Sequence, residues 1–431
     1  MNYYSTNNKN QKVSLREAVI QGLAPDNGLY MPESIPTLPS SFFESLHKLS
    51  FQEIGFQVAK NLIGNDIPTS ELRRIVDHTI QFEAPLIEIE KNIFSLELFH
   101  GPTLAFKDFG ARFLSGLLGY FANQQDKEIT ILVATSGDTG SAVANGFFNV
   151  PGTKVIVLYP SGKVSDIQEK QFTTLGGNIT ALEIDGTFDD CQRLVKQAFL
   201  DEQLKQKLFL TSANSINIAR LIPQSFYYFR AFAQLKEKQN PIVFSVPSGN
   251  FGNLTAGLFA KRMGLPVHRF IAATNQNDIV PTYLKTKLFS PRPSVQTISN
   301  AMDVGNPSNF ARMLDLYQND FGSFSGDVAG CHYSDEQTNM AMREVFESKK
   351  YILDPHGAVG YLGLKEYSKS NPNAVGIFLE TAHPVKFGEV VERAIDQSVA
   401  IPERLNSYLK KEKQSKKMAN SFSGLKEFLF R

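Results

Sequence analysis

Cysteine and tryptophan are the residue types that this sequence most clearly lacks. It contains two cysteines, Cys191 and Cys331, which form no CxxC pair, and it contains no tryptophan. Two isolated cysteines are far too few for a disulfide framework, so we expect both thiols to be reduced. A small scaffold held together by disulfides is therefore excluded.

The chain also lacks an excess of either charge. Its 44 Lys and Arg residues stand against 43 Asp and Glu residues, which gives a formal net charge of +1 at pH 7. Dedicated nucleic-acid binders usually carry a clear basic excess. The Lys-rich run at 410–417 has no interleaved aromatic residue, so we interpret it as a solvated helix face or a linker. We expect no nucleic-acid partner.

Long apolar runs are absent as well. The polar amino terminus has no apolar segment of signal-peptide type, and the longest apolar stretches, such as 129–134 and 155–159, have the length of a strand. A membrane-spanning helix needs about 20 apolar residues. We therefore expect a soluble cytoplasmic protein with no membrane partner.

Several common signatures of nucleotide and metal sites are missing. No GxG occurs, which removes the dinucleotide fingerprint, and Gly162-Lys163 is followed by Val164, where a Walker A loop needs Ser or Thr. The seven histidines form neither HxxxH nor HExxH, so a zinc site is unsupported. We expect no metal.

What is present is the composition of a globular protein, with 42% hydrophobic and 20% charged residues in 431 positions. Residues 1–91 are polar, with a turn signal at 25–28, and predict a helix-rich N-terminal domain. From residue 92 to 431, short apolar runs alternate with Gly-rich turns and helical periods, which predicts an α/β fold built on parallel sheets. The clearest predicted strands are 129–134, 155–159 and 242–246.

Two small-residue turns stand where an apolar strand gives way to a helix. The first is Thr135-Ser136-Gly137-Asp138-Thr139-Gly140-Ser141, and the second is Pro247-Ser248-Gly249-Asn250-Phe251-Gly252-Asn253. Such a turn exposes backbone N–H groups at the positive end of a helix dipole, where a carboxylate or phosphate binds. One such turn alone is more often an ordinary capped turn. Two in one α/β chain favour anion binding.

One lysine in the sequence is a candidate nucleophile that can act together with these two turns. Lys107 lies between Phe106 and Phe109 at the start of a predicted amphipathic helix. Burial against aromatic groups disfavours an ammonium ion and yields a nucleophilic amine. Taken alone, a lysine is more often a surface residue whose stem lies on apolar neighbours. A desolvated lysine together with two anion-binding turns is what pyridoxal 5′-phosphate (PLP) chemistry on an amino acid requires.

These segments resemble the threonine synthase family of PLP enzymes over the full length of the chain. HGPTLAFKDFGARF at 100–113 is similar to the segment of the cofactor-bearing lysine, TSGDTGSAVANGF at 135–147 to the substrate-carboxylate loop, and PSGNFGN at 247–253 to the cofactor-phosphate loop. Further family-like stretches are NSINIARLIPQ at 214–224, MDVGNPSNF at 302–310, ETAHPVKF at 380–387 and, in the N-terminal domain, DNGLYMPE at 26–33.

The resemblance implies fold type II of PLP enzymes, with the cofactor between two α/β lobes, the smaller at roughly 110–215. It also implies the activity of a carbon–oxygen lyase: O-phospho-L-homoserine and water become L-threonine and phosphate by β,γ-replacement, the last step of threonine biosynthesis. The partner implied is therefore a small-molecule substrate.

The resemblance also implies roles for individual residues. Lys107 would carry the cofactor, Thr381 would face the pyridine nitrogen, and the cofactor phosphate would lie on Gly249, Asn250, Phe251, Gly252 and Asn253. The substrate carboxylate would lie on Ser136, Gly137 and Thr139. Asp138 belongs to the same substrate-binding loop, but the wider superfamily usually has an Asn there that bonds the cofactor's 3′-oxygen. A carboxylate donates a hydrogen bond only when protonated, so the role of Asp138 stays open.

The substrate phosphate calls for cations. Arg220 and Lys163 are the preferred candidates, because Arg offers a planar fork and Lys a compact charge; Ser161 and Lys386 are further ones. For each of these four residues, an ordinary surface position is an equally good interpretation. His356 and His383 are interpreted as hydrogen-bonded structural residues, since a lone His more often is one.

Two other functions remain open from the sequence. The first is another fold type II activity, such as a threonine or serine dehydratase, a cysteine synthase or a related phospho-lyase. The second is a PLP-binding or ligand-binding protein without turnover. The presence of Lys107 and of both loops argues against it.

Overall fold

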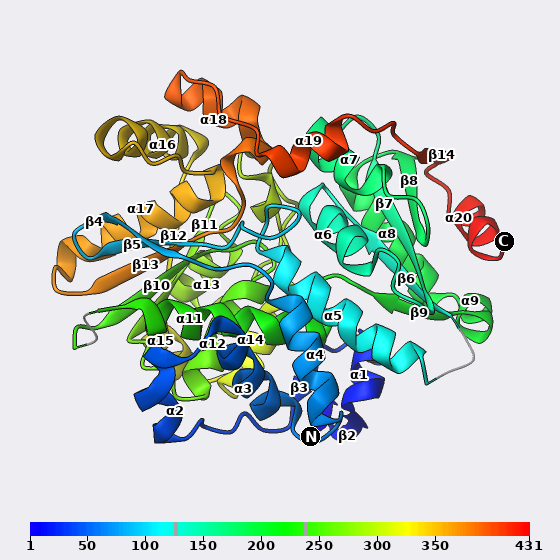
Figure 1. Ribbon diagram of the computed structural model, residues 1–431, viewed down its shortest axis with the longest axis horizontal. Coiled ribbons are helices and arrows are strands. Elements are labelled where there is room, and N and C mark those ends of the chain that lie inside the picture. The colour runs from blue at the N-terminus through cyan, green and yellow to red at the C-terminus, as the bar shows by residue number, and fades with distance from the viewer. Residues whose placement is uncertain (125–127, 237–238) are drawn as a thin grey trace.

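Two large sheets and one small sheet organise the chain in the computed structural model, which describes residues 1–124, 128–236 and 239–431. In Figure 1 the six-stranded sheet lies on the left, the five-stranded sheet on the right, and the N-terminal helices below them. The predicted α/β architecture is confirmed.

The five-stranded sheet is parallel throughout, in the order β14-β8-β7-β6-β9. Its strands are β6 (Ile129–Ala134), β7 (Thr153–Pro160), β8 (Ile179–Asp185), β9 (Phe209–Ser212) and β14 (Ser415–Ala419). All of β6 is buried, because helices cover both faces, and such strands are continuously apolar. The predicted strands 129–134 and 155–159 are confirmed.

Helices on the two faces of this sheet pack on alternate residues of its strands. Ile131 and Val133 belong to the core beside α5 (Lys107–Ala122) and α6 (Asp138–Phe147), whereas Leu132 and Ala134 pack with α8 (Phe188–Leu200). The remaining helices of this lobe are α7 (Asp166–Thr173), α9 (Glu202–Lys207), α19 (Glu403–Leu409) and α20 (Phe422–Leu429).

The six-stranded sheet has the order β12-β11-β10-β13-β5-β4 and is parallel except for the β4–β5 pair. Its strands are β4 (Leu86–Glu90), β5 (Ile93–Glu97), β10 (Ile242–Pro247), β11 (Arg269–Thr274), β12 (Val328–His332) and β13 (Val375–Glu380). The predicted strand 242–246 is confirmed within β10.

The helices around this sheet form two groups. Those on the side that continues into the main core are α10 (Ile218–Leu221), η2 (Ile222–Ser225), α11 (Phe226–Gln234), α12 (Gly252–Arg262), α13 (Ile279–Thr286), α14 (Phe310–Leu316) and α15 (Phe321–Asp327). Those in or beside the second core cluster are η3 (Asn300–Met302), α16 (Asp335–Lys349), α17 (Pro355–Ser370), η4 (Pro384–Phe387) and α18 (Gly388–Ile395).

The N-terminal unit contains the expected helices and also a sheet that the sequence did not predict. Its helices are α1 (Leu15–Gln21), α2 (Ser40–Ser45), η1 (Leu46–Lys48), α3 (Phe51–Ile63) and α4 (Thr69–Thr79). The sheet joins β1 (Asn2–Ser5), β2 (Asn8–Ser14) and β3 (Tyr30–Pro32) in antiparallel fashion. β2 is polar and mostly exposed, so it shows no apolar alternation.

The C-terminal segment returns to the five-stranded sheet (Figure 1). The Lys-rich run at 410–417 enters β14, which pairs with β8, and does not form a helix. Lys413 contacts the carboxylates of Glu169 at 2.6 Å and Glu183 at 2.9 Å. Charge pairing therefore fixes part of this run to the lobe.

Two kinds of feature are absent from the described ranges. No helix in 1–124, 128–236 or 239–431 has both the length and the apolar character needed to cross a bilayer. Within the same ranges, no three His, Cys, Asp or Glu side chains gather in a way that could hold a metal ion.

One buried arginine joins the N-terminal unit to the rest of the molecule. Arg312 of α14 is 0% exposed. Its guanidinium donates to the carbonyl oxygens of Tyr30 at 3.0 Å, Ser215 at 3.1 Å and Ile216 at 2.6 Å, and to Oδ1 of Asn309 at 2.7 Å. Burial lowers the pKa of this guanidinium to about 9, which leaves it charged at neutral pH.

We predict that Arg312→Met lowers the free energy of unfolding by about 3 kcal/mol, because four buried acceptors lose a charged donor. The matched control is Arg74→Met: the Arg74 side chain is 61% exposed and pairs only with Glu71 one turn earlier, so its loss should cost less than about 0.5 kcal/mol. Urea denaturation of both variants measures the difference. Equal midpoints would show that Arg312 does not join the two units.

Candidate functional site

The candidate site is a cavity of about 140 Å³ at the carboxyl ends of strands from both large sheets. Residues at or just beyond the ends of β6, β10 and β13 line it, which is where parallel sheets place ligands. The predicted residues that line it are Lys107, Ser136, Asp138, Thr139, Arg220, Gly249, Asn250, Phe251, Gly252, Asn253 and Thr381. Gly137 and Lys163 are predicted residues that do not line it.

Lys107 is held in the cavity by the chain that precedes it. The backbone N–H of Phe106 donates to the carbonyl of Thr381 at 2.8 Å, and Ala105 forms a bridge with Ala382, so the start of α5 is fixed to the end of β13. Thr381 therefore lies beside the segment that carries Lys107, and both residues line the cavity. The Lys107 amine lies 5.6 Å from the centre of the Phe106 ring.

The surroundings of Lys107 favour its neutral form. Its side chain is 16% exposed. Burial lowers the pKa of the amine, the cations of Lys386 and Arg220 lower it further, and the Asp138 carboxylate opposes them. The ring of Phe109 packs on Phe82 in the core, so the aromatic neighbour of the amine is Phe106.

The turn after β6 presents free backbone donors to the cavity. Gly137 has φ +139°, and the hydroxyl of Thr135 accepts from the N–H groups of Gly137 at 2.9 Å and of Gly140 at 2.8 Å. Among the described residues, the N–H groups of Ser136, Asp138 and Thr139 have no hydrogen-bond partner. With the positive end of α6, they make a cradle for one anion.

Gly137 contributes space and conformation to this cradle. Its own N–H is already bonded to Thr135, so it does not add a donor. A Cβ atom at this position would lie 2.5 Å from the amide of Gln168, and φ +139° is a conformation that L side chains rarely adopt. The turn therefore needs glycine here.

The turn after β10 presents a longer series of free donors. In the described part of the chain, the N–H groups from Gly249 to Asn253 have no partner. Phe251 is left-handed at φ +60°, and a left-handed residue in such a run turns successive N–H groups toward one point. A Cβ atom at Gly249 would lie 2.8 Å from the Ala301 carbonyl, so only glycine permits this approach. This second cradle fits a phosphate.

A buried amide group in the second cradle supports this fit. The Oδ1 atom of Asn253 accepts from the hydroxyls of Tyr227 and Tyr228, each at 2.7 Å. Its Nδ2 atom is buried and has no partner. A buried donor without an acceptor costs about 1–3 kcal/mol, and a bound anion would supply that acceptor.

Arg220 is the buried cation of the cavity. It lies in α10 and donates through Nη1 to the carbonyl of Ala213, while its Nε atom is buried without a partner. A Cβ atom at Gly110 would come within 2.7 Å of that Nε, so glycine leaves room for the guanidinium. Burial lowers the pKa of Arg220 to about 10, and it remains a cation at neutral pH.

Asp138 lies between two lysines. Its Oδ2 atom is 3.4 Å from the amine of Lys107, and its Oδ1 atom is 2.6 Å from the amine of Lys386 and accepts from Gln168 at 2.8 Å. Burial acts to raise the pKa of this carboxyl, but the two cations outweigh it and hold the pKa well below its usual range. Asp138 is therefore an anion in the site.

The three other candidates for the substrate phosphate do not line the cavity. Lys163 is exposed in the turn after β7 and lines neither this cavity nor the wider cleft beside it. Ser161, in the same turn, donates to Glu183 at 2.7 Å. Lys386 is fully buried against Asp138 and does not line the cavity.

The two histidines are hydrogen-bonded, as interpreted from the sequence. His356 pairs through Nδ1 with Asp354 at 2.5 Å and accepts through Nε2 from the Ala301 N–H at 3.2 Å, so it holds one wall of the cavity. His383 caps η4 by accepting from the Val385 N–H at 3.2 Å. Burial and the nearby His100 lower the pKa of His383 to about 4.

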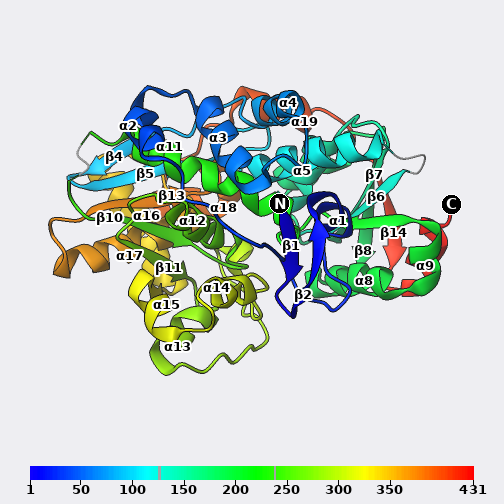
Figure 2. The ribbon, with the colours of Figure 1, turned by 90° about the horizontal axis from the view of Figure 1, so that it is seen from below.

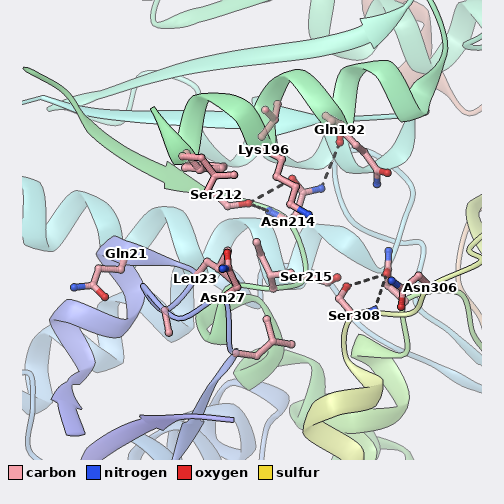
Figure 3. Close-up of a pocket in the computed structure, with 18 of the residues that line it drawn as sticks. Gln21, Leu23, Asn27, Gln192, Lys196, Ser212, Asn214, Ser215, Asn306 and Ser308 are labelled. Carbon is pink, nitrogen blue, oxygen red and sulfur yellow. Dashed lines mark hydrogen bonds between the residues drawn. The ribbon is translucent and has the colours of Figure 1, made fainter. Parts of the chain in front are cut away.

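The sequence did not single out several polar residues that line the cavity, among them Gln192, Asn214, Ser215 and Asp303. Asn214 and Ser215 lie in the family-like stretch 214–224, in which Arg220 alone was chosen because it is charged. A wider cleft of about 1320 Å³ shares all four residues with the cavity. Figure 3 shows this cleft, with Gln192 and Lys196 of α8 on one side, Leu23 and Asn27 of the N-terminal unit on another, and Asn306 and Ser308 beyond Ser215.

In Figure 2, β1 and β2 lie between the two halves of the molecule. The turn that joins these strands, with Thr6 and Asn7, lines the cleft together with Gln192 and Lys196 of α8. The cleft is thus bounded by three parts of the chain that are far apart in sequence. It shares Asn214, Ser215, Asn250 and Asp303 with the cavity that Lys107 lines.

Family models account for nearly the whole chain. The model described as "Threonine synthase N terminus" matches residues 2–80, "Pyridoxal-phosphate dependent enzyme" matches 81–378, and "Threonine synthase, C-terminal" matches 357–429.

Individual proteins agree with the family models. A threonine synthase from Haemophilus influenzae is 47% identical over 100% of both chains. The crystal structure of threonine synthase from Escherichia coli matches with a TM-score of 0.93 and 46% identity, covering 100% of this chain and 99% of that one. The structure of PLP-bound threonine synthase from Brucella melitensis matches with a TM-score of 0.93 and 34% identity, covering 100% and 98%.

We predict that borohydride reduction in the presence of PLP attaches the cofactor to Lys107, because burial lowers the pKa of this amine and it lines the same cavity as both cradles. Peptide mapping by mass spectrometry should find the cofactor on the peptide that contains Lys107, and Lys107→Ala should remove it. Lys163→Ala, in the exposed turn, is the control and should leave the label in place. Label on any other lysine would refute the assignment.

Proposed function

The chain belongs to the threonine synthase family of PLP-dependent enzymes, and we propose that its cavity converts O-phospho-L-homoserine and water to L-threonine and phosphate. The observation that carries this proposal is the juxtaposition of Lys107 with two separate sets of free N–H donors and the buried Arg220 guanidinium. Such a site can hold a cofactor phosphate, a carboxylate and a second phosphate together.

We assign the cofactor phosphate to the cradle from Gly249 to Asn253. The free N–H groups and the unpartnered Nδ2 of Asn253 support this place. Thr381, which lines the same cavity as Lys107, would hold the pyridine nitrogen. When bound, PLP supplies an electron sink conjugated to the substrate's α-carbon. A threonine hydroxyl does not enforce protonation of the pyridine nitrogen, so more of the chemistry depends on residues placed around it.

We assign the substrate carboxylate to the turn after β6. The N–H groups of Ser136, Asp138 and Thr139 are the donors, and the positive end of α6 favours an anion there. The Asp138 side chain points its charge toward the two lysines, which leaves the backbone N–H group of the same residue for the substrate. Binding at this cradle orients the α-carbon relative to Lys107.

We assign the substrate phosphate to Arg220, with the neighbouring Asn214 and Ser215 as hydrogen-bonding partners. All three line the cavity, and the unpartnered Nε of Arg220 supports a ligand there. Arg binds phosphate through two parallel N–H donors, which fixes the leaving group in one orientation. Lys163 lies outside both cavities, so we do not place the phosphate on it.

The proton transfers fall to Lys107. An uncharged amine beside the α-carbon can accept the α-proton and can later take or return protons at the β- and γ-carbons. In the net reaction the bond from the γ-carbon to the phosphate oxygen breaks, and one proton adds to the γ-carbon. The β-carbon loses one proton and gains the hydroxyl of water, and the remaining proton leaves with the phosphate.

The organisation of the chain follows the same proposal. We propose an N-terminal domain of residues 1–91 and a catalytic region of 92–431, whose smaller lobe is roughly 110–215. The last strand of the first part, β4, pairs with β5 of the six-stranded sheet. We infer that the protein acts in the cytoplasm on a small-molecule substrate, without nucleic-acid or membrane partners.

We predict that O-phospho-L-homoserine yields threonine and one phosphate per threonine, and that free homoserine yields neither. Homoserine lacks the leaving group, and it leaves the Arg220 cation without its partner. Arg220→Met should lower kcat/KM by roughly ten- to hundredfold, because each lost charge-assisted hydrogen bond costs about 1.5–3 kcal/mol. Threonine and phosphate are measured in the same samples.

Lys163→Met is the matched control and should keep kcat/KM within about twofold, since a surface substitution away from a site has little effect. Efficient deamination of threonine, with no threonine formed from phosphohomoserine, would favour a dehydratase and overturn the proposal.

A further inference from the structure

Three charged side chains from three different segments meet beside the cavity. Lys107 begins α5, Asp138 begins α6 of the smaller lobe, and Lys386 lies in η4, just beyond the end of β13. The Asp138 carboxylate contacts both amines, at 3.4 Å for Lys107 and 2.6 Å for Lys386. The cluster therefore links the two lobes at the catalytic lysine.

The Lys386 side chain is buried, and its amine is held by two partners. Its side chain is 0% exposed. Besides Asp138, its amine donates to the carbonyl of Thr103 at 2.8 Å. Gln168 donates to the same Asp138 oxygen that Lys386 contacts, so the carboxylate is fixed with its other oxygen toward Lys107.

We propose that Lys386 is a positioning residue that neutralises the Asp138 carboxylate, so that Lys107 can remain an uncharged amine beside an anion. This inference rests on the proposed function of Lys107 as the cofactor-bearing lysine. A buried carboxylate without a second cation would instead stabilise the ammonium form of Lys107, and an ammonium ion is neither a nucleophile nor a base.

The other charges that face this cluster do not replace Lys386. Arg220 also faces Lys107, but it makes no contact with Asp138; it lines the cavity, and its Nε atom is buried beside Gly110. Asp108, next to Lys107 on α5, has both oxygens bonded to Thr103, and burial raises the pKa of its carboxyl. Arg112 is bonded to the carbonyl of His78 and to Gln81. Asp303 and His356 line the opposite wall.

This pairing gives a role to the carboxylate that the sequence left unexplained. An Asn in place of Asp138 would be neutral and would need no cation. An Asp adds one negative charge 3.4 Å from the lysine, and Lys386 supplies one positive charge 2.6 Å from it. The two substitutions Asp138→Asn and Lys386→Met should therefore change the basicity of Lys107 in opposite directions.

The test measures Lys107 directly on the full-length protein with its cofactor removed. Trace labelling with acetic anhydride between pH 6 and pH 11, followed by mass spectrometry of the Lys107 peptide, gives the fraction of uncharged amine at each pH. Lys386→Met should move this profile to higher pH and lower labelling at pH 7 by roughly tenfold, because an unopposed anion then faces the amine. Asp138→Asn should move the profile to lower pH.

The double variant Asp138→Asn/Lys386→Met should return the profile close to that of the parent protein, and Lys386→Arg should keep it nearly unchanged, since the charge is retained. Lys365→Met is the control for losing an exposed ion pair, here with Glu90, and should not move the Lys107 profile. Circular dichroism confirms that each variant is folded. If Lys386→Met folds and leaves the profile in place, or moves it to lower pH, the inference is wrong.

The labelling needs no cofactor or substrate, so it is independent of the proposed function. If PLP were found on another lysine, the function assigned to Lys107 would fail while the labelling profiles would stand. If the Lys107 adduct formed but the profiles of the variants did not differ, the role of Lys386 alone would fail.

Discussion

The buried carboxylate of Asp138 is the interaction on which the rest of the site depends. It contacts Lys107 and is held by Lys386, which belongs to the other lobe. The contact with Lys386 therefore neutralises the carboxylate and also joins the two lobes. Burying an unpaired charge costs free energy. A cluster of one carboxylate and two amines has no net charge when one of the amines is neutral. That neutral amine is the one from which the proposed chemistry begins.

The sheets bring this cluster and the two cradles together because parallel strands release their loops at one edge. The turn after β6 forms the cradle proposed for the carboxylate, and the turn after β10 forms the one proposed for the cofactor phosphate. The segment after β13 contains Thr381 and Lys386. The N-terminal unit takes part through Arg312, which binds the carbonyls of Tyr30 and Ser215. Ser215 lines the cavity, so the fold of the first residues bears on the position of a substrate-facing side chain.

The sequence predicted the strands and turns whose conformation depends on neighbouring residues. Apolar strands followed by small-residue turns identified β6 and β10, and the structure brings both turns and Lys107 to one cavity. Their binding roles stay predictions. Pairings over long sequence distances could not be predicted this way: Lys386 appeared as one of several free cations, and its partner Asp138 lies about 250 residues earlier. Lys163 was preferred for the compact charge of a lysine in a family-like segment, and in the fold its side chain is exposed. The strand β2 was not predicted because nearly all of its residues are polar and it therefore shows no apolar alternation.

The most direct test of the account is a crystal structure of the protein with PLP and a phosphonate analogue of phosphohomoserine. The account predicts the cofactor phosphate on the N–H groups from Gly249 to Asn253, the analogue's carboxylate on Ser136 and Thr139, and its phosphonate on Arg220. A phosphonate bound in the wider cleft beside Lys196, or at Lys163, would contradict it, as would a cofactor ring with its nitrogen away from Thr381.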